Sequence, residues 1–174
     1  MNLLIRSETA ADRSAIYQVN KLAFEQESEA RLVDLLRESD AFIPGLSLVA
    51  VLDNQIVGHI LFSRIHIVSD TGNKVESIAL APVAVLPQFQ KQGIGKLLIK
   101  RGLDDACTLN YESVIVLGHP EYYPKFGFVP AEKWNIKAPF NVPSEAFMAL
   151  ELIPGKLDNV SGIVEYAKEF QEIS

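Results

Sequence analysis

The stretch that decides the fold joins an expected strand to an expected helix and reads Val83-Ala84-Val85-Leu86-Pro87-Gln88-Phe89-Gln90-Lys91-Gln92-Gly93-Ile94-Gly95-Lys96. Its two glycines allow backbone N–H groups to approach a ligand closely, and the helix that follows directs the positive end of its dipole to the same place. Lys91 and Lys96 add positive charge there. These features predict a site for a phosphate-bearing ligand. The alternative is a glycine-rich helix start that binds nothing.

The spacing of this loop excludes two common nucleotide-binding loops. A dinucleotide-binding fold needs a third glycine at the position of Leu98. A P-loop needs Gly-Lys followed by serine or threonine, whereas Gly95-Lys96 is followed by Leu97. The remaining pattern is Gln-x-x-Gly-x-Gly, which begins at Gln90 and follows a strand that ends in Val-Leu-Pro.

This pattern resembles the signature of the GNAT superfamily of N-acetyltransferases, which is Gln/Arg-x-x-Gly-x-Gly/Ala after a strand ending in Val-x-Pro. The aromatic stretch 118–128 fits as well and is similar to a bacterial subgroup of mostly unassigned substrate. The resemblance covers most of the chain. It implies an α/β fold with a central, mixed but mostly antiparallel sheet, splayed fourth and fifth strands, and flanking helices. It also implies acetyl-CoA as co-substrate and no metal.

In such folds the pantetheine arm of the cofactor lies between the splayed strands, which here correspond to Ile78–Leu86 and Val114–Leu117. Pro82 agrees with such a gap, because a proline inside a strand predicts a bulge or a separated neighbour. The resemblance implies pantetheine contacts near the backbone of Val83, Ala84 and Val85. It implies pyrophosphate contacts from the backbone N–H groups of Gln90, Lys91, Gln92, Gly93, Ile94, Gly95 and Lys96.

Acetyl transfer to an amine needs a neutral amine, stabilisation of the transition state and a proton for the departing thiolate. The superfamily places a tyrosine four residues before the glycine of a Gly-Phe pair, and this position is Tyr123. Tyr123 is therefore the expected general acid. Tyr122 is the alternative, because nearby prolines leave the local geometry open. A packing role beside Phe126 and Phe128 is the other reading of both rings.

Glu76, expected at the start of the central strand, is the candidate general base, acting directly or through water. Its alternative role is that of an exposed charge at a strand end.

His119 precedes a proline, which is typical of a turn residue, and His59 and His66 are expected to be structural. The sequence has no Gly-x-Ser-x-Gly elbow, and its histidines lack metal-ligand spacing. Cys107 is expected to be a small core residue.

Length, charge and cysteine content limit the classes of protein to which this chain can belong. The chain has 174 residues, 48% of them hydrophobic, which predicts a single domain over residues 1–174. A formal net charge of −6 offers no general attraction for nucleic acid or an anionic membrane. One cysteine, and no apolar run of signal-peptide or membrane-spanning length, predict a cytoplasmic protein.

Hydrophobic periodicity predicts the remaining elements. A capping box at Thr9–Asp12 begins the first helix, and a second helix runs from Ser28 to about Ser39. A turn at Pro44-Gly45 precedes a hairpin of two strands, Leu46–Leu52 and Ile56–Val68. A further helix is expected over Gln90–Leu109, and further strands at Leu3–Ile5, Val75–Leu86, Ser113–Leu117, Ala146–Ile153 and Ile163–Tyr166.

The leading hypothesis is an N-acetyltransferase that moves the acetyl group of acetyl-CoA to a primary amine of a small molecule or protein by direct attack. The alternative is a non-catalytic sensor or interaction module that binds CoA or acyl-CoA. Neither the acceptor amine nor the oligomeric state, a homodimer included, is determined by the sequence.

Overall fold

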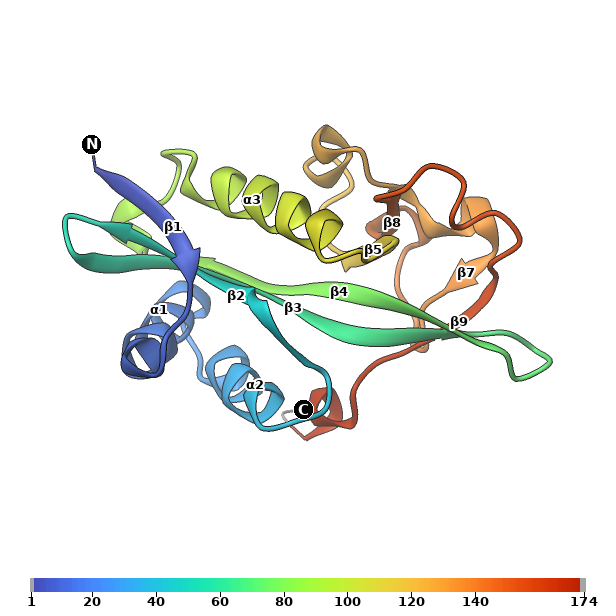
Figure 1. The fold of residues 1–174 in the computed structure, drawn as a ribbon, viewed down its shortest axis with the longest axis horizontal. Helices are drawn as coiled ribbons and strands as arrows, with labels where there is room; N and C mark the ends of the chain where they lie inside the picture. Colours follow the sequence, from blue (N-terminus) through green and yellow to red (C-terminus); the bar gives the residue numbers. More distant parts are fainter. Residues whose placement is uncertain (1, 173–174) are drawn as a thin grey trace. The chain divides into compact units, whose positions relative to one another are not determined.

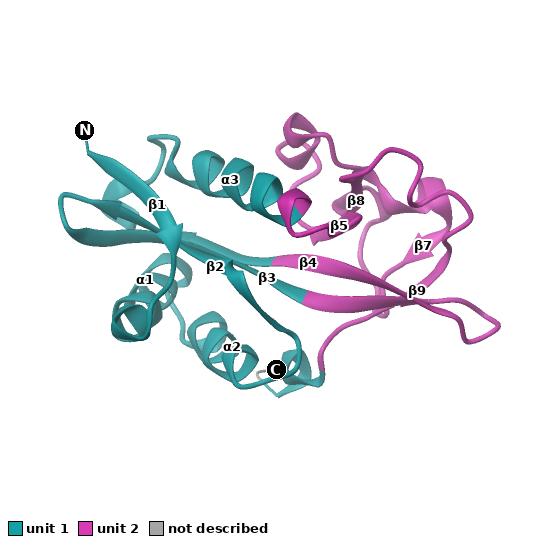
Figure 2. Ribbon diagram, viewed as in Figure 1, with its two compact units in different colours: residues 1–63, 81–106, 168–174 teal, residues 64–80, 107–167 magenta. Residues whose placement is uncertain are grey.

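The computed structural model describes residues 2–172, and the chain divides into two compact units (Figures 1 and 2). Unit 1 comprises residues 1–63, 81–106 and 168–174, and unit 2 comprises residues 64–80 and 107–167. The strands β3 (Gln55–Val68) and β4 (Lys74–Val85) contribute residues to both. The sheet has the strand order β1-β2-β3-β4-β5-β8-β6, and β9 pairs with both β3 and β7.

In unit 1, β1 (Leu3–Ser7) pairs with β2 (Phe42–Leu52), and β2 pairs with β3, both antiparallel. The β2–β3 register shifts between Phe42 and Ser47. This is where the sequence predicted a turn at Pro44-Gly45. The strand continues through it, because Gly45 adopts a φ of 92° that a bulge can use. The predicted turn is therefore an irregularity inside one strand.

The helices of unit 1 cover both faces of its strands (Figure 2). They are α1 (Arg13–Phe24), α2 (Ser28–Arg37) and α3 (Ile94–Thr108). His59 of β3 contacts Asn20 of α1, whereas the ring of Phe62 lies directly against Gly102 of α3. Because successive side chains of a strand point to opposite faces, α1 and α3 lie on opposite sides of β3.

The helix α3 begins at Ile94 rather than at the predicted Gln90, because the residues between them form the glycine loop. Its predicted apolar stripe is confirmed, since Ile94, Leu98, Leu103 and Ala106 are all buried. The prediction for Cys107 was wrong, because this residue is exposed. Neighbouring helix positions are rotated by about 100°, so a buried Ala106 turns Cys107 away from the core.

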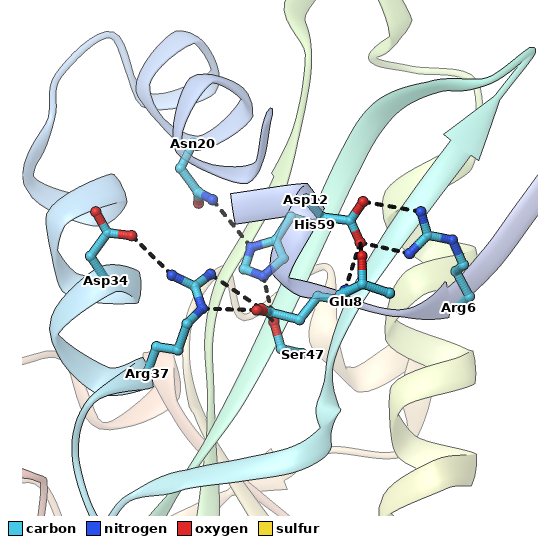
Figure 3. A network of polar contacts seen from close by, with 9 residues as sticks. Arg6, Glu8, Asp12, Asn20, Asp34, Arg37, Ser47 and His59 are labelled. Atoms are coloured by element: carbon cyan, nitrogen blue, oxygen red, sulfur yellow. Dashed lines mark hydrogen bonds and ion pairs between the residues drawn. The ribbon is translucent and has the colours of Figure 1, made fainter. Parts of the chain in front are cut away.

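A buried polar network joins the helices of unit 1 to its strands (Figure 3). Nε of Arg37 donates to the Glu8 carboxylate at 2.8 Å, and the Ser47 hydroxyl donates to the same carboxylate. Since that proton points at Glu8, Ser47 accepts from Nε2 of His59 at 2.9 Å. Nδ1 of His59 then accepts from Nδ2 of Asn20 at 3.1 Å. Both ring nitrogens are satisfied only if the imidazole is neutral.

This network predicts a pH-dependent stability. Burial, with a smaller effect of Arg37, lowers the pKa of His59 to about 3. The unfolded chain takes up a proton below about pH 6.5 that the folded chain excludes, so the free energy of unfolding falls as the pH drops from about 6.5 toward 3. One proton gives a slope of about 1.4 kcal/mol per pH unit. We expect the free energy of unfolding of His59→Gln, measured by urea unfolding between about pH 6 and 4, to lack this slope. If the slope of the variant equals that of the wild type, the assignment to His59 is contradicted.

In unit 2, β5 (Ser113–Leu117) pairs antiparallel with β8 (Phe147–Glu151), and β8 pairs with β6 (Val129–Pro130). The predicted strands at 146–153 and 163–166 are thus confirmed, the latter as β9 (Gly162–Glu165), which pairs with β7 (Ile136–Lys137). An apolar cluster that includes Ile115, Ile136, Phe147 and Leu157 forms the core of this unit.

The strands β4 and β5 are parallel over two residue pairs, Ile78 with Val114 and Ala79 with Ile115. Their ladder ends there, although β4 continues to Val85 and β5 to Leu117. Pro82 lies in β4 just beyond the last pair. The predicted mixed, mostly antiparallel sheet is therefore confirmed, with a parallel β4–β5 ladder that spans these two pairs.

Candidate active site

The glycine loop is fastened to the strand that precedes it. After β4, a single 3-10 turn (Pro87–Phe89) redirects the chain, with the Phe89 N–H donating to the Leu86 carbonyl at 2.8 Å. The Gln90 side chain then reaches back, and its Nε2 donates to the Val85 carbonyl at 2.9 Å. The Gln90 backbone N–H lies 3.4 Å from the Pro87 carbonyl, to which it donates. These bonds fix the direction in which the loop enters α3.

The loop backbone adopts left-handed conformations at two positions, with φ of 64° at Lys91 and 87° at Gly93. The first helical hydrogen bond runs from the Leu97 N–H to the Gly93 carbonyl at 3.1 Å. The N–H groups of Ile94, Gly95 and Lys96 therefore precede the helical ladder and have no partner within the helix. They are the donors that a helix N-terminus offers to an anion.

The space beside the two glycines of the loop is open. A Cβ atom placed on Gly93 would meet no heavy atom within 4 Å, and one on Gly95 would meet only Cγ2 of Val85, at 3.8 Å. Lys91 and Lys96 are both exposed. The site therefore combines donors that have no partner within the helix, free space beside the two glycines and exposed positive side chains, which together suit a phosphate group.

The residues predicted to contact the pantetheine arm lie at the end of β4, before the chain enters the glycine loop. Val83 and Val85 are half-buried, whereas Ala84 is buried, as expected for alternation along β4. The ten predicted cofactor residues lie in unit 1, while Tyr123 and Glu76 lie in unit 2 (Figure 2).

Tyr123 begins a single 3-10 turn (Tyr123–Phe126) and is 8% exposed. Its ring makes edge contacts with the rings of Tyr122 and Phe128, with centroids 5.2 Å and 5.8 Å apart. It also lies against Gly118, where a Cβ atom would come within 2.7 Å of Cδ2 and nearer still to Cε2. The ring position is therefore fixed by packing on several sides. Tyr122 is only half-buried.

The two tyrosines differ in their ionisation. Burial, with a smaller effect of Tyr122, raises the pKa of Tyr123 to about 12. Burial also raises the pKa of Tyr122 above its ordinary value. The Tyr123 phenol therefore keeps its proton at every physiological pH and is a hydrogen-bond donor rather than a base.

The other predicted side chains are exposed. Glu76 is exposed near the start of β4, next to the buried Ser77, and its carboxylate forms no hydrogen bond or ion pair with another residue of the range 2–172. His119 is also exposed, and its carbonyl accepts from the Tyr122 N–H at 3.1 Å, as expected for a turn residue.

Within the described chain, no group of three or more His, Cys, Asp or Glu side chains could hold a metal ion. No described helix is long and apolar enough to cross a membrane.

The side-chain role of Gln90 and the role of Gly118 were not predicted from the sequence. The Gln90 side chain was considered only as part of the loop backbone, although its place at the head of Gln-x-x-Gly-x-Gly was a signal. Gly118 directly follows β5, and only a glycine leaves room there for the Tyr123 ring. Its place as the first residue of the aromatic stretch 118–128 was the available signal.

The sequence of residues 13–128 matches the acetyltransferase (GNAT) family. The chain is 34% identical over 169 residues to the uncharacterized N-acetyltransferase YhbS of Escherichia coli K12, which covers 97% of this chain and 98% of that protein. It is 39% identical over 136 residues to the uncharacterized N-acetyltransferase YjhQ of the same strain, which covers 78% of this chain and 75% of that protein.

Two solved structures are similar to the fold. The crystal structure of Escherichia coli YhbS in complex with CoA has a TM-score of 0.89 and 31% identity, covering 98% of this chain and 93% of that chain. A GNAT family acetyltransferase from Brucella melitensis in complex with acetyl-CoA has a TM-score of 0.78 and 33% identity, covering 97% and 98%. With more than half of its length matched by the family and relatives aligned almost end to end, the chain belongs to the acetyltransferase (GNAT) family.

Proposed function

We propose that this protein transfers the acetyl group of acetyl-CoA to a primary amine of a small molecule or protein. The observation that supports this most strongly is the glycine loop, whose positive φ at Gly93 and unpaired N–H groups at the start of α3 form a site for a pyrophosphate. The relatives solved with CoA and acetyl-CoA support the same ligand.

The chain's residues hold the cofactor mainly through the backbone. The N–H groups of Ile94, Gly95 and Lys96 bind the pyrophosphate, and the backbone of β4 at Val83 and Val85 binds the pantetheine arm where the β4–β5 ladder has ended. The Gln90 side chain positions the loop through its bond to the Val85 carbonyl, which is an addition to the backbone role predicted for it.

Acetyl-CoA, when bound, supplies an activated thioester. The acceptor nitrogen forms the new N–C bond, the C–S bond breaks, and the nitrogen loses a proton while the sulfur leaves as thiolate or thiol. We assign Tyr123 to the sulfur. Because its pKa is about 12 and that of a thiol is about 8.5, complete proton transfer to a free thiolate is uphill. The phenol therefore acts chiefly by a hydrogen bond to the charge that develops on sulfur.

Glu76 is the proposed proton acceptor for the amine. Its carboxylate is exposed and unpaired among the described residues, which lets it attract a cationic amine and take its proton through water.

The test is a panel of primary amines incubated with acetyl-CoA, with free thiol measured over time and the melting temperature measured in parallel. A transferase releases thiol faster when its amine is present. If acetyl-CoA raises the melting temperature but no amine accelerates thiol release, the protein is a sensor of acyl-CoA and the proposal fails.

Gly118→Ala tests how Tyr123 is positioned. The added methyl would overlap the Tyr123 ring, which cannot slide away because Phe126 and Phe128 pack against it. We expect kcat to fall by about tenfold or more, with the dissociation constant of acetyl-CoA little changed. In a Tyr123→Phe background the same change should cost much less, because the hydroxyl that it misplaces is already gone. Equal losses in the two backgrounds would contradict a positioning role.

A further inference from the structure

Unit 2 contains a cavity of about 290 Å³ beside β7 and the segment that follows it. Its apolar lining includes Ile136 and Phe147, which are almost completely buried, and Phe140, which is 47% exposed. Ligand pockets in proteins usually measure about 300–1,000 Å³, so this cavity has room for one small molecule and not for a peptide segment. It is not part of the glycine loop, which lies in unit 1.

Packing within the protein fixes the position of Phe140, which forms the exposed side of the cavity. The Phe140 ring stacks on Tyr166, with centroids 6.0 Å apart and an interplanar angle of 18°. Pro139 and Pro143 on either side restrict the backbone of this segment. An exposed aromatic ring fixed in this way loses little entropy when a ligand packs against it. The site is therefore preorganised for an apolar group.

Two side chains of opposite charge also line the cavity, Glu132 and Lys137. Both are exposed, and neither forms an ion pair or a side-chain hydrogen bond with another residue of the described range 2–172. A carboxylate and an ammonium group at the edge of an apolar cavity suit a ligand that carries both charges. A simple amine would meet the Lys137 charge without compensation, and a simple carboxylate would meet Glu132.

The cavity and Tyr123 are connected through the end of β5. Phe147 of the cavity pairs with Leu117, the last residue of β5, and the next N–H group, that of Gly118, donates to the Ala146 carbonyl at 2.9 Å. Gly118 in turn lies against the Tyr123 ring. Both features are thus built on the same end of the β5–β8 ladder, within unit 2.

We propose that this cavity binds a small zwitterion with an apolar body, of the class of the aliphatic and aromatic amino acids, with Glu132 pairing its ammonium group and Lys137 its carboxylate. Resting on the proposed function, this zwitterion is the acetyl acceptor. Its ammonium group, positioned by Glu132, loses a proton through water to Glu76, the neutral nitrogen forms the N–C bond as the C–S bond of the thioester breaks, and CoA leaves as thiolate or thiol.

Binding is tested on the full chain without acetyl-CoA by calorimetric titration of phenylalanine and leucine, with phenethylamine and phenylpropionate as probes that lack one charge. We expect saturable binding of the amino acids and binding weaker by about tenfold or more for each single-charge probe. Glu132→Gln and Lys137→Met should weaken amino-acid binding to a similar degree. Lys133→Met is the matched control and should leave it unchanged, because Lys133 lies over the Trp134 ring and is not part of the cavity lining.

Equal affinity for phenylalanine and phenethylamine, or no effect of Glu132→Gln and Lys137→Met, would overturn the inference. The two proposals fail separately. Amine acetylation with an acceptor KM that these two variants leave unchanged would remove the cavity as the acceptor site and keep the transferase. Amino-acid binding that depends on Glu132 and Lys137, without acetylation of any amine, would keep the cavity and remove the transferase.

Discussion

Replacing Gly93 with valine is expected to weaken acetyl-CoA binding by at least about tenfold while the protein remains folded. The φ of 87° at Gly93 is strained for any residue with a Cβ atom and most of all for a β-branched one, at a cost of about 1–3 kcal/mol. The loop can release this strain by rotating its peptide groups, which turns the N–H donors away from the pyrophosphate. The dissociation constant of acetyl-CoA, measured by calorimetric titration, checks the prediction.

Gly72→Val is the matched control for this experiment. Gly72 has a φ of 88° and, like Gly93, would place its Cβ atom in open space, but it lies in the turn between β3 and β4. We expect the same kind of strain to lower the melting temperature and to leave the affinity unchanged.

Gly95→Ala is a second, unstrained variant. Its methyl group would be in ordinary contact with Val85, 3.8 Å away, and would occupy space beside the first turn of α3. If both Gly93→Val and Gly95→Ala bind acetyl-CoA with wild-type affinity, the glycine loop is not the pyrophosphate site.

Tyr123→Phe is expected to lower kcat by about 10²-fold with little change in acetyl-CoA affinity. The substitution keeps the ring that packs against Phe128 and Gly118 and removes only the hydroxyl. Since the pKa of Tyr123 is about 12, the phenol is protonated throughout the usual assay range, and we expect the full loss from about pH 6 to 8. Above about pH 9 the loss should persist, because the phenol keeps its proton there and still donates to the charge that develops on sulfur.

Tyr122→Phe is the control, because Tyr122 is adjacent to Tyr123 and only half-buried. We expect nearly wild-type turnover from it. If Tyr122→Phe alone loses turnover, then Tyr122 and not Tyr123 is the residue that acts on the cofactor sulfur. If neither variant loses turnover at any pH, both rings serve only packing.

Local patterns predicted most of the fold. The strand, glycine loop and helix of residues 83–109 could be recognised because each feature is written in consecutive residues: an apolar run, two glycines at fixed spacing, and a buried stripe of Ile94, Leu98, Leu103 and Ala106. The short strand β9 was also predictable from its composition. The start of α3 and the path of β2 through Pro44-Gly45 differed, because both depend on backbone conformations that composition does not specify. The two-residue strands β6 and β7 were not predicted.

The remaining features depend on tertiary packing. Glu8, Arg37 and Ser47 each resemble an ordinary surface residue in the sequence, and only the folded chain brings them to His59 (Figure 3). The cavity beside β7 could not be predicted from the sequence either, because its lining comes from a loop, a two-residue strand and β8. Sequence periodicity cannot predict a pocket that is assembled from such short segments.

The most direct test of the acetyltransferase assignment follows the acetyl group itself. Acetyl-CoA with an isotopically labelled acetyl group is incubated with the protein and a panel of primary amines that includes apolar amino acids, and the products are separated and identified by mass spectrometry. The structure predicts that the label is recovered in an amide on one class of amine, and that Gly93→Val and Tyr123→Phe both reduce its formation. Label that stays on CoA, or that is recovered only as free acetate with every amine present, would contradict it.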